Sequence, residues 1–222
     1  SPTAQSGVAL AVQPAVRLAD AFGNLVATTG VVVTAGFGSG TGTLGGTLTA
    51  NTAAGIATFT NLSIAGASGP YTLRFTSGAL TAVTSNTITL AAGTAARLVV
   101  VTEPSASAQN AVAFAQQPTV QVQDAAGNPV AGVVPVTAAI ATGGGALGGT
   151  VTVNTNGTGL ATFTNLAITG TVGARTLAFS SGALTPDTST AVTISAGAAT
   201  QIAVNAGNGQ TATVNTAVTT AP

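Results

Sequence analysis

Eight charged side chains hold nearly all the acid–base and metal-binding chemistry available to this 222-residue chain. They are spread along the sequence: Asp20, Glu103, Asp124 and Asp187, with Arg17, Arg74, Arg97 and Arg175. The sequence contains no His, Lys or Cys, so neither a Ser–His–Asp triad nor a Ser–Lys dyad can form. A pair of carboxylates in one pocket would need to bring together acids that are distant in the sequence. We therefore expect no catalytic residues, no cofactor and no enzyme activity.

Calcium is the metal that these acids could bind. It takes about six to eight oxygen ligands, commonly including several carboxylates. Asp20 and Asp124 each precede an Asn by four positions, and Glu103 lies between the two halves of the chain. In the alternative interpretation, each Asp starts a turn and accepts hydrogen bonds from the backbone of that turn. Asp20, Asp124 and Glu103 are calcium candidates beside that structural role.

The charge balance argues against nucleic acid and membrane partners. Net charge is zero, and charged residues make up 4% of the chain, against roughly 25% in a typical soluble domain. No run of bases is present to neutralise phosphates, so nucleic-acid binding is not expected. No stretch of about 20 apolar residues is present, so we expect no membrane insertion through a spanning helix.

The arginines and the glycine runs also have a functional and a structural interpretation. Arg74, Arg97 and Arg175 could make adhesive contacts, but we expect them at outward strand positions, where a charge solubilises the sheet and protects its edge. The runs "GFGSGTGTLGG" and "GGGALGG" are not followed by the Lys and Ser or Thr of a phosphate-binding loop. They predict hairpin turns or bulges.

The elements that must position these residues occur twice. The segment "VRLADAFGNLVAT" at 16–28 returns as "VQVQDAAGNPVAG" at 120–132, a shift of 104 positions. Likewise "GIATFTNLSIAG" at 55–66 returns as "GLATFTNLAITG" at 159–170. A third copy begins near the end, where "TQIAVNAGN" at 200–208 matches "ARLVVVTEP" at 96–104. A period of this length suits one independently folded domain per repeat.

Within each repeat, apolar and polar residues alternate. In "YTLRFT" at 71–76, Tyr71, Leu73 and Phe75 fall on one face, and in "VQVQ" at 120–123 the same is true of Val120 and Val122. This period of two predicts half-buried antiparallel strands. Gly and Asn clusters interrupt the pattern after every 8–12 residues or so. Short strands at this spacing, in units of roughly 100 residues, predict an all-β fold of tandem immunoglobulin-like antiparallel β-sandwiches.

The order of the motifs resembles bacterial Ig-like (Big) domains, the invasin/intimin-type tandem repeats of cell-surface proteins. The resemblance covers nearly the whole chain and depends on the pattern Q-P-x-V-x-V-x-D-A-x-G-N-x-V, then L-G-G-T, then G-x-A-T-F-x-N-L-x-I. It is carried by these residues and their partners in the second copy: Gln13, Pro14, Asp20, Gly23, Asn24, Gly55, Phe59 and Phe75. It implies an extracellular spacer. The very low charge departs from the family, and the lectin-like receptor-binding tip of invasins has no counterpart here.

We expect three segments: repeat 1 at 1–93, lacking its first strand, repeat 2 at 94–197, and the start of a third repeat at 198–222. The predicted function is a structural module, a spacer, stalk or fibre segment of a bacterial surface protein, at the cell surface or outside the cell. Its expected partners are neighbouring repeats of the same chain or adjacent identical subunits.

Two alternatives come from other classes of function. The first is a filament subunit that polymerises head to tail, because the strand missing from repeat 1 could be supplied by the third-repeat start of another chain. The second is an adhesin module that binds a receptor or glycan. Exposed aromatic residues would favour the adhesin, but Tyr71, the only Tyr, is predicted to face inward.

Overall fold

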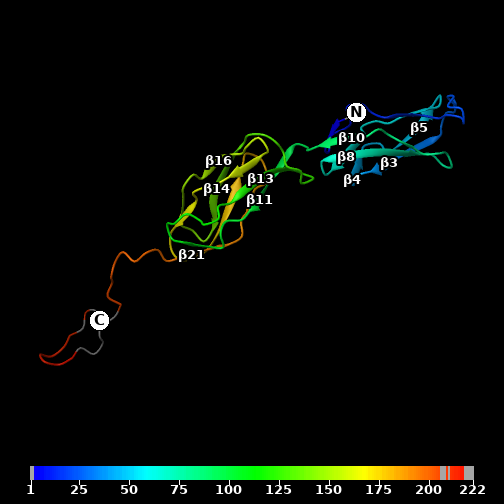
Figure 1. Ribbon diagram of the computed structural model, residues 1–222. Coiled ribbons are helices and arrows are strands. Elements are labelled where there is room, and N and C mark those ends of the chain that lie inside the picture. The colour runs from blue at the N-terminus through cyan, green and yellow to red at the C-terminus, as the bar shows by residue number, and fades with distance from the viewer. Residues whose placement is uncertain (1–2, 206–208, 210, 218–222) are drawn as a thin grey trace.

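Every regular element is a β-strand in the computed structural model, which describes residues 3–205, 209 and 211–217 (Figure 1). No helix occurs among these residues, so none of them belongs to a helix able to cross a membrane. The strands form two separate sandwiches in chain order, followed by residues 196–205 without a strand. The fold is all-β, as the period-two pattern predicts.

The first sandwich contains the strands β1–β10. A hydrogen-bonded path runs β1-β10-β8-β3-β5-β6-β2, with β9 beside β8, and β4 pairs separately with β7. The β5–β6 pair links the two layers of the sandwich along this path. The strands are β1 (Thr3–Gln5), β2 (Ala15–Arg17), β3 (Val32–Ser39), β4 (Gly42–Gly45), β5 (Thr49–Ala53), β6 (Ile56–Thr58), β7 (Ser63–Gly66), β8 (Gly69–Thr76), β9 (Val83–Thr84) and β10 (Ile88–Ala91).

The second sandwich repeats this arrangement and adds one strand. One layer has the order β12-β21-β19-β14-β16 with β20 beside β19, and the other has β11-β13-β17, while β15 pairs with β18. The added strand is β11, which has no counterpart among the described residues of the first sandwich. The strands are β11 (Ala95–Thr102), β12 (Ser107–Gln109), β13 (Thr119–Asp124), β14 (Pro135–Thr142), β15 (Ala146–Gly148), β16 (Thr152–Asn154), β17 (Leu160–Thr162), β18 (Ala167–Thr169), β19 (Gly173–Ser180), β20 (Asp187–Thr188) and β21 (Val192–Ser195).

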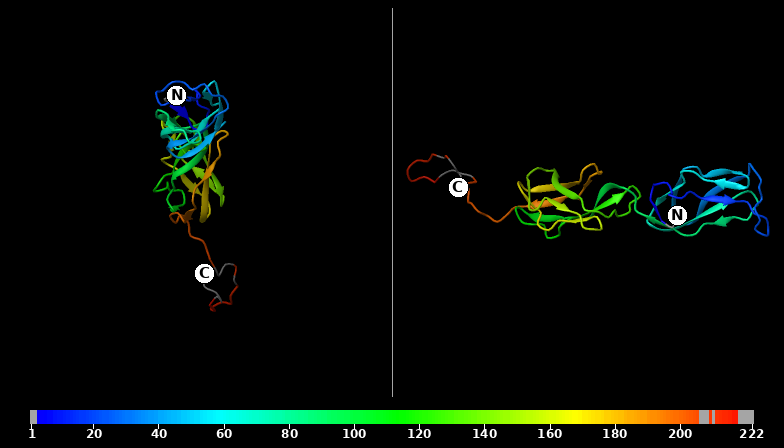
Figure 2. Two further views of the ribbon diagram at one scale, coloured as in Figure 1. Left: turned by 90° about the vertical axis from the view of Figure 1, so that its right-hand side faces the viewer. Right: turned by 90° about the horizontal axis from the view of Figure 1, so that it is seen from above.

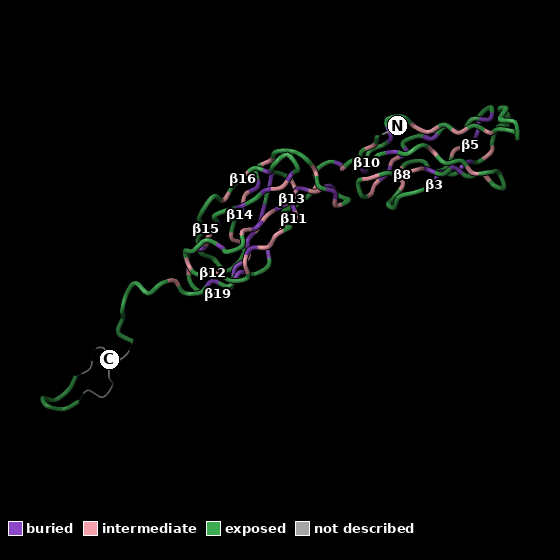
Figure 3. Tube along the Cα trace, viewed as in Figure 1, coloured by how far each residue is buried: buried purple, intermediate pink, exposed green. Residues whose placement is uncertain are grey.

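Each sandwich encloses its own hydrophobic core, seen as buried segments along the strands in Figure 3. Tyr71, Leu73 and Phe75 on β8 point into the first core, as their alternation predicts. An aromatic pair lies in each core: the ring centroids of Phe59 and Phe75 are 5.1 Å apart in the first sandwich. Those of Phe163 and its partner on β19 are 5.4 Å apart in the second. The repeat therefore preserves core packing as well as strand order.

The two sandwiches lie end to end, both in Figure 1 and in the right-hand view of Figure 2, which is turned by 90° from it. The segment after β21 leads away from the second sandwich in all views. Part of the predicted third-repeat start, at 206–208, 210 and 218–222, lies outside the described residues. The elongated form follows from joining two sandwiches at their ends rather than along their faces.

Arg175 is not at an outward position, which corrects the sequence-based expectation. It is 4% exposed, and its guanidinium donates to the carbonyl oxygens of Gly144 and Thr171, at 2.7 Å each. In the first sandwich the hydroxyl of Tyr71 donates to the corresponding carbonyl oxygens, of Thr41 and Ala67. The polar end of each long side chain satisfies backbone groups that would otherwise be buried without a partner.

Candidate functional site: the junction between the sandwiches

The turn after β13 forms the centre of the junction. Asp124 is 2% exposed, and its Oδ1 accepts a hydrogen bond from the backbone N–H of Asn128 at 2.8 Å. The Asn128 side-chain amide donates to Asp124 Oδ2, also at 2.8 Å. The glycine between them, Gly127, has φ +90°, which a residue with a Cβ rarely adopts. The sequence Asp-x-x-Gly-Asn therefore closes a tight, self-bonded turn.

The same two side chains also bond to the first sandwich and to the linker. Asn128 Oδ1 accepts a hydrogen bond from the backbone N–H of Ser68 at 2.7 Å, and its amide donates to the carbonyl oxygen of Gly66 at 2.9 Å. Asp124 Oδ2 accepts a hydrogen bond from the backbone N–H of Gly93 at 2.6 Å. These three bonds connect the second sandwich to the β7–β8 loop and to the chain leaving β10, so they resist both bending and rotation at the junction.

Gly93 is required at this point because other segments of the same chain approach it closely. A Cβ built on Gly93 would lie 2.6 Å from the carbonyl oxygen of Ser6 and 3.2 Å from Asp124 Oδ2. Real Cβ atoms do not come that near to an oxygen, so a larger residue would have to move the linker. The linker glycine is thus part of the junction and does not act as a flexible spacer.

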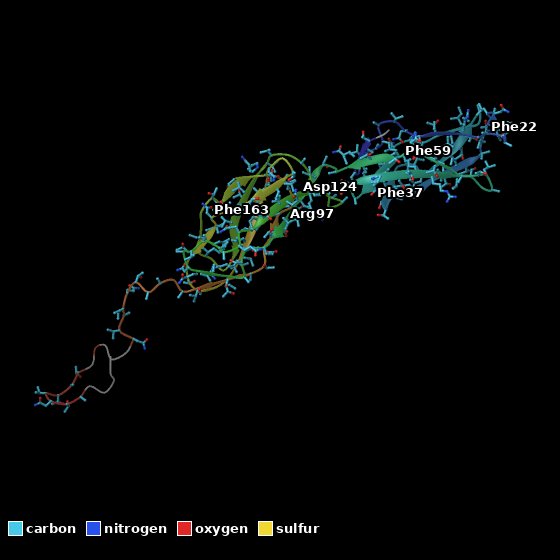
Figure 4. The ribbon with its side chains drawn as sticks, viewed as in Figure 1. Phe22, Phe37, Phe59, Arg97, Asp124 and Phe163 are labelled. Carbon is cyan, nitrogen blue, oxygen red and sulfur yellow. The ribbon has the colours of Figure 1, made fainter. Side chains whose placement is uncertain are left out.

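The first sandwich carries the same turn without a partner domain in this chain. Asp20 accepts hydrogen bonds from the backbone N–H and the side-chain amide of Asn24, at 2.8 Å and 3.0 Å. Both residues are exposed, and Phe22 between them is 92% exposed. Figure 4 shows Phe22 at the far tip of the first sandwich and Asp124 between the two sandwiches. The turn folds in both settings, and the neighbouring sandwich decides whether it is buried.

The hydrogen bonds set the acidity of both carboxyls. The hydrogen bond from the Asn24 side chain, together with backbone donors, lowers the pKa of Asp20 below its ordinary 3.8. Burial acts to raise the pKa of Asp124, but hydrogen bonds from Asn128 and Gly93 outweigh it and lower that pKa below 3.8 as well. Both carboxylates are therefore ionised at neutral pH, and Asp124 is a charged acceptor inside the junction.

The structure separates the calcium candidates. Asp124 lies between the two sandwiches, whereas Asp20 bonds to the backbone of Phe22, which lies at the far tip of the first sandwich. The carboxylate of Glu103 accepts a hydrogen bond from the backbone N–H of Thr190 at 2.9 Å. No group of three or more His, Cys, Asp or Glu residues occurs within the described part of the chain. The turn role of the two aspartates is visible in their hydrogen bonds, and calcium binding stays a prediction.

The sequence pattern predicts the turn at Asp124 and Asn128 but not the hydrogen-bond partners of these two side chains across the junction. Their partners across the junction are the backbone groups of Gly66, Ser68 and Gly93, which carry no chemical signal of their own. Gly66 and Gly93 do have counterparts in the second repeat, Gly170 and Gly197, and this repetition of glycine was the available clue. The exposure of Phe22 also goes beyond the sequence pattern, because this residue lies in a turn, where strand alternation does not apply.

Similarity to known proteins is found among solved structures. A scan of family models and a search of curated proteins find no match. Among solved structures, the D0-D1 domains of intimin match at 20% identity, covering 87% of this chain and 94% of that one, with a TM-score of 0.34. The D00-D0 domains of intimin match at 19% identity, covering 69% and 78%, with a TM-score of 0.39. Invasin, a bacterial integrin-binding protein, matches at 18% identity, covering 83% and 37%, with a TM-score of 0.33.

The expected resemblance to intimin and invasin domains is thus found among these structures. The assignment of two immunoglobulin-like sandwiches rests on the strand pairing and the two separate cores described above.

Proposed function

We propose that this chain is a non-enzymatic spacer, a segment of a stalk or fibre at the surface of a bacterium or outside it. The observation that carries the proposal is the junction, where Asp124 and Asn128 bond to three backbone groups of the preceding sandwich and linker. A module that binds ligand through its loops does not need a fixed angle to its neighbour. A spacer needs a fixed angle, because its end-to-end distance depends on the angle between neighbouring domains.

Both free ends of the pair present the matching halves of the same junction. The turn at Asp20 and Asn24 is exposed at one end. At the other end, Gly170 and Gly197 are the counterparts of Gly66 and Gly93. Asn110 Oδ1 accepts a hydrogen bond from the backbone N–H of Gly170 at 2.9 Å. Ser6 Oγ accepts the corresponding hydrogen bond from Gly66 in the first sandwich. The partners that fit these ends are further copies of the same repeat.

The composition supports an exposed location. A protein outside the cell meets proteases, and trypsin-like enzymes cleave after Lys and Arg. This chain has no Lys and four Arg, one of which, Arg175, is buried within a hydrogen-bonded site. Thr, Ser, Asn and Gln side chains keep the outer faces hydrated without adding sites for such enzymes.

A display experiment tests the spacer function. Residues 1–205 are placed between an outer-membrane anchor and a terminal epitope, and antibody access to the epitope is compared with that of a Gly/Ser linker of equal length. A Gly/Ser chain coils, so its end-to-end distance grows only with the square root of its length. We expect the epitope to be accessible above the native cell-surface polysaccharide with the sandwiches and hidden with the linker. Equal access in both strains would contradict a spacer role.

A further inference from the structure

The turn between β16 and β17 carries an Asn-Gly pair at 156–157. The same hairpin of the first sandwich, between β5 and β6, turns through an Ala pair at 53–54 and has no side-chain amide. Thr52 and Thr155 enter the two turns in the same way, and each hydroxyl donates to a backbone carbonyl oxygen at 2.7 Å. The hairpin therefore folds without Asn-Gly, and the pair needs another explanation.

Gly157 is not required by the shape of the turn. A Cβ built on it would meet no atom within 4 Å, and its φ lies outside the left-handed region that favours glycine. Gly159 is different, because it has φ +80° and a Cβ there would collide with the carbonyl oxygen of Val130. What glycine provides at 157 is an unshielded backbone nitrogen directly after an asparagine.

Two polar groups of this exposed pair are unbonded. The side-chain nitrogen of Asn156 and the backbone N–H of Gly157 make no hydrogen bond within the part of the chain that the structure describes. The backbone nitrogen is a potential nucleophile, and the side-chain carbonyl carbon of the preceding asparagine is the electrophile that it can reach by closing a succinimide ring. Solvent has free access to both.

The side-chain oxygen of Asn156, by contrast, is fully bonded. Oδ1 accepts hydrogen bonds from the backbone N–H groups of Thr158 and Leu160, both at 3.0 Å, and from the Thr158 hydroxyl at 2.7 Å. These donors draw electron density from Cγ, and they are aimed at the atom on which negative charge develops when Cγ is attacked. Nucleophile, electrophile and charge-stabilising donors thus all come from residues 156–160.

The other described asparagines lack this combination. Asn128 precedes Pro129, which has no N–H, and its amide is bonded in the junction. The remaining described asparagines are each followed by a residue whose side chain shields its backbone nitrogen. A second Asn-Gly pair occurs at 208–209, but Asn208 lies outside the described residues.

We propose that this turn modifies itself, by attack of the backbone nitrogen of Gly157 on Cγ of Asn156. The N–Cγ bond forms, solvent carries the proton of the Gly157 N–H to Nδ2, and the Cγ–Nδ2 bond breaks to release ammonia. Water then opens the succinimide at either of its two carbonyl carbons. Opening at Cγ leaves aspartate at position 156, and opening at the main-chain carbonyl leaves isoaspartate. The reaction consumes only water, and the proposal does not rest on the spacer function.

The two products differ in their effect on the turn. Aspartate keeps a side-chain oxygen for the same donors and adds a charge, which strengthens these hydrogen bonds. Isoaspartate lengthens the main chain by a carbon atom, although the backbone N–H of Asn156 donates across the turn to the carbonyl oxygen of Leu160 at 2.8 Å. The preceding Thr155 is 3% exposed and is bonded to Gly132 and Val134, so the turn has little room to adjust. Isoaspartate should therefore break the turn.

Ageing of the complete chain at neutral pH tests the proposal. Samples are unfolded and cut with trypsin after Arg97 and Arg175, so that Asn156 lies in fragment 98–175 and Asn208 in fragment 176–222. We expect fragment 98–175 to gain negative charge with time and to become a substrate for a methyltransferase specific for isoaspartate. An unaged sample corrects for reaction during handling, and the Asn-Gly pair of the other fragment is the positive control. A fragment 98–175 that stays free of isoaspartate overturns the proposal.

Gly157→Ala is the matched variant for the nucleophile. The added Cβ meets no atom in the turn but shields the backbone nitrogen. We expect isoaspartate to form in fragment 98–175 about tenfold more slowly, which corresponds to about 1.4 kcal/mol in the barrier, with an unchanged melting temperature. Isoaspartate formation at the parent rate in G157A overturns the assigned nucleophile.

Thr158→Val and Thr158→Ser test the role of the hydroxyl. Valine removes the O–H donor to Asn156 Oδ1 and serine keeps it, and the position is exposed, so neither change should alter stability much. We expect T158V to react more slowly than the parent and T158S to react at the parent rate. A hydroxyl that only holds the turn would give the opposite sign, because a looser turn frees the asparagine to react. A T158V chain that reacts as fast as the parent, or faster, overturns the assigned role.

Thermal unfolding separates the two products. Asn156→Asp represents the aspartate product, and we expect it to melt at or above the temperature of the parent chain. The isoaspartate form, isolated from the aged parent by ion exchange, should melt at a lower temperature. Equal melting temperatures for the two products would overturn the predicted break of the β16–β17 turn.

Discussion

Asp20 and Asp124 occupy the same position of the same turn. The hydrogen bonds within the two turns are alike, but one turn is exposed and the other is buried. Each accepts the N–H of an Asn four residues on, but Asp124 also accepts the N–H of Gly93 from the linker. Asp20 faces solvent. This natural pair lets one residue type be tested inside and outside a junction in a single chain.

The lowered pKa of Asp124 predicts acid sensitivity of the junction. The pKa in the folded protein lies below the ordinary 3.8, so ionisation stabilises the folded state above pH 3.8. That stabilisation is lost as the pH falls from about 4 through the folded pKa. We expect the melting temperature of the chain to drop over this range, and Asp124→Asn to drop less steeply. An unchanged slope in D124N would show that the acid sensitivity arises elsewhere.

Arg175 and Tyr71 show that one structural role can be filled by two residue types. Removing the donor in Arg175→Leu leaves the carbonyl oxygens of Gly144 and Thr171 buried without a partner, at a cost of about 1–3 kcal/mol. Arg175→Tyr restores the solution used in the first sandwich, so we expect a smaller loss. Urea unfolding followed by circular dichroism measures both. Equal losses in the two variants would contradict this equivalence.

At the scale of elements, β11 is the strand by which the two sandwiches differ. Leu98 is buried in the core, whereas its counterpart Ile202 is exposed. Leu98→Ala should destabilise the second sandwich by about 2–5 kcal/mol, as for other buried Leu residues. Ile202→Ala at low concentration should change the unfolding free energy little. Chemical denaturation measures both changes in the free energy of unfolding. Equal losses in the two variants would contradict this difference between Leu98 and Ile202.

The strands were predictable from sequence because alternation in a half-buried sheet is a local property. Tyr71, Leu73 and Phe75 on β8 and Val120 and Val122 on β13 face inward as expected. The segment after the Asp124 turn does not continue directly into a regular strand. Only an isolated bridge forms there, at Pro129, and the next strand, β14, begins at Pro135. Proline cannot donate to a ladder, which delays regular pairing.

The junction was not predictable in the same way. Its two side chains have a recognisable turn signature, but their partners are backbone groups from segments about 30 and 60 residues away. Among the residues that the structure describes, the identical turn at Asp20 has no such partners. Local sequence therefore fixes the turn, and the arrangement of whole domains decides what the turn binds. Arg175 departs from its expected outward position because backbone carbonyl oxygens inside the sandwich accept hydrogen bonds from its guanidinium.

At the scale of the whole molecule, the account rests on a fixed angle between the two sandwiches. Two hydrogen bonds to the β7–β8 loop and one to the linker would limit bending, and the close approach at Gly93 would limit linker motion. If each junction in a longer array is built in this way, the end-to-end distance grows in proportion to the number of domains. With flexible linkers it would grow more slowly, because the linkers coil.

The most direct test is the distance distribution between spin labels on the two sandwiches, measured by pulsed electron paramagnetic resonance. Labels at Thr89→Cys and Ala139→Cys lie on exposed positions of different sandwiches in a chain without other Cys residues. We predict one narrow distribution for the parent, the same distribution in Asp20→Ala, and a broad one in Asp124→Ala. A broad distribution in the parent, or an unchanged one in D124A, would contradict the fixed junction.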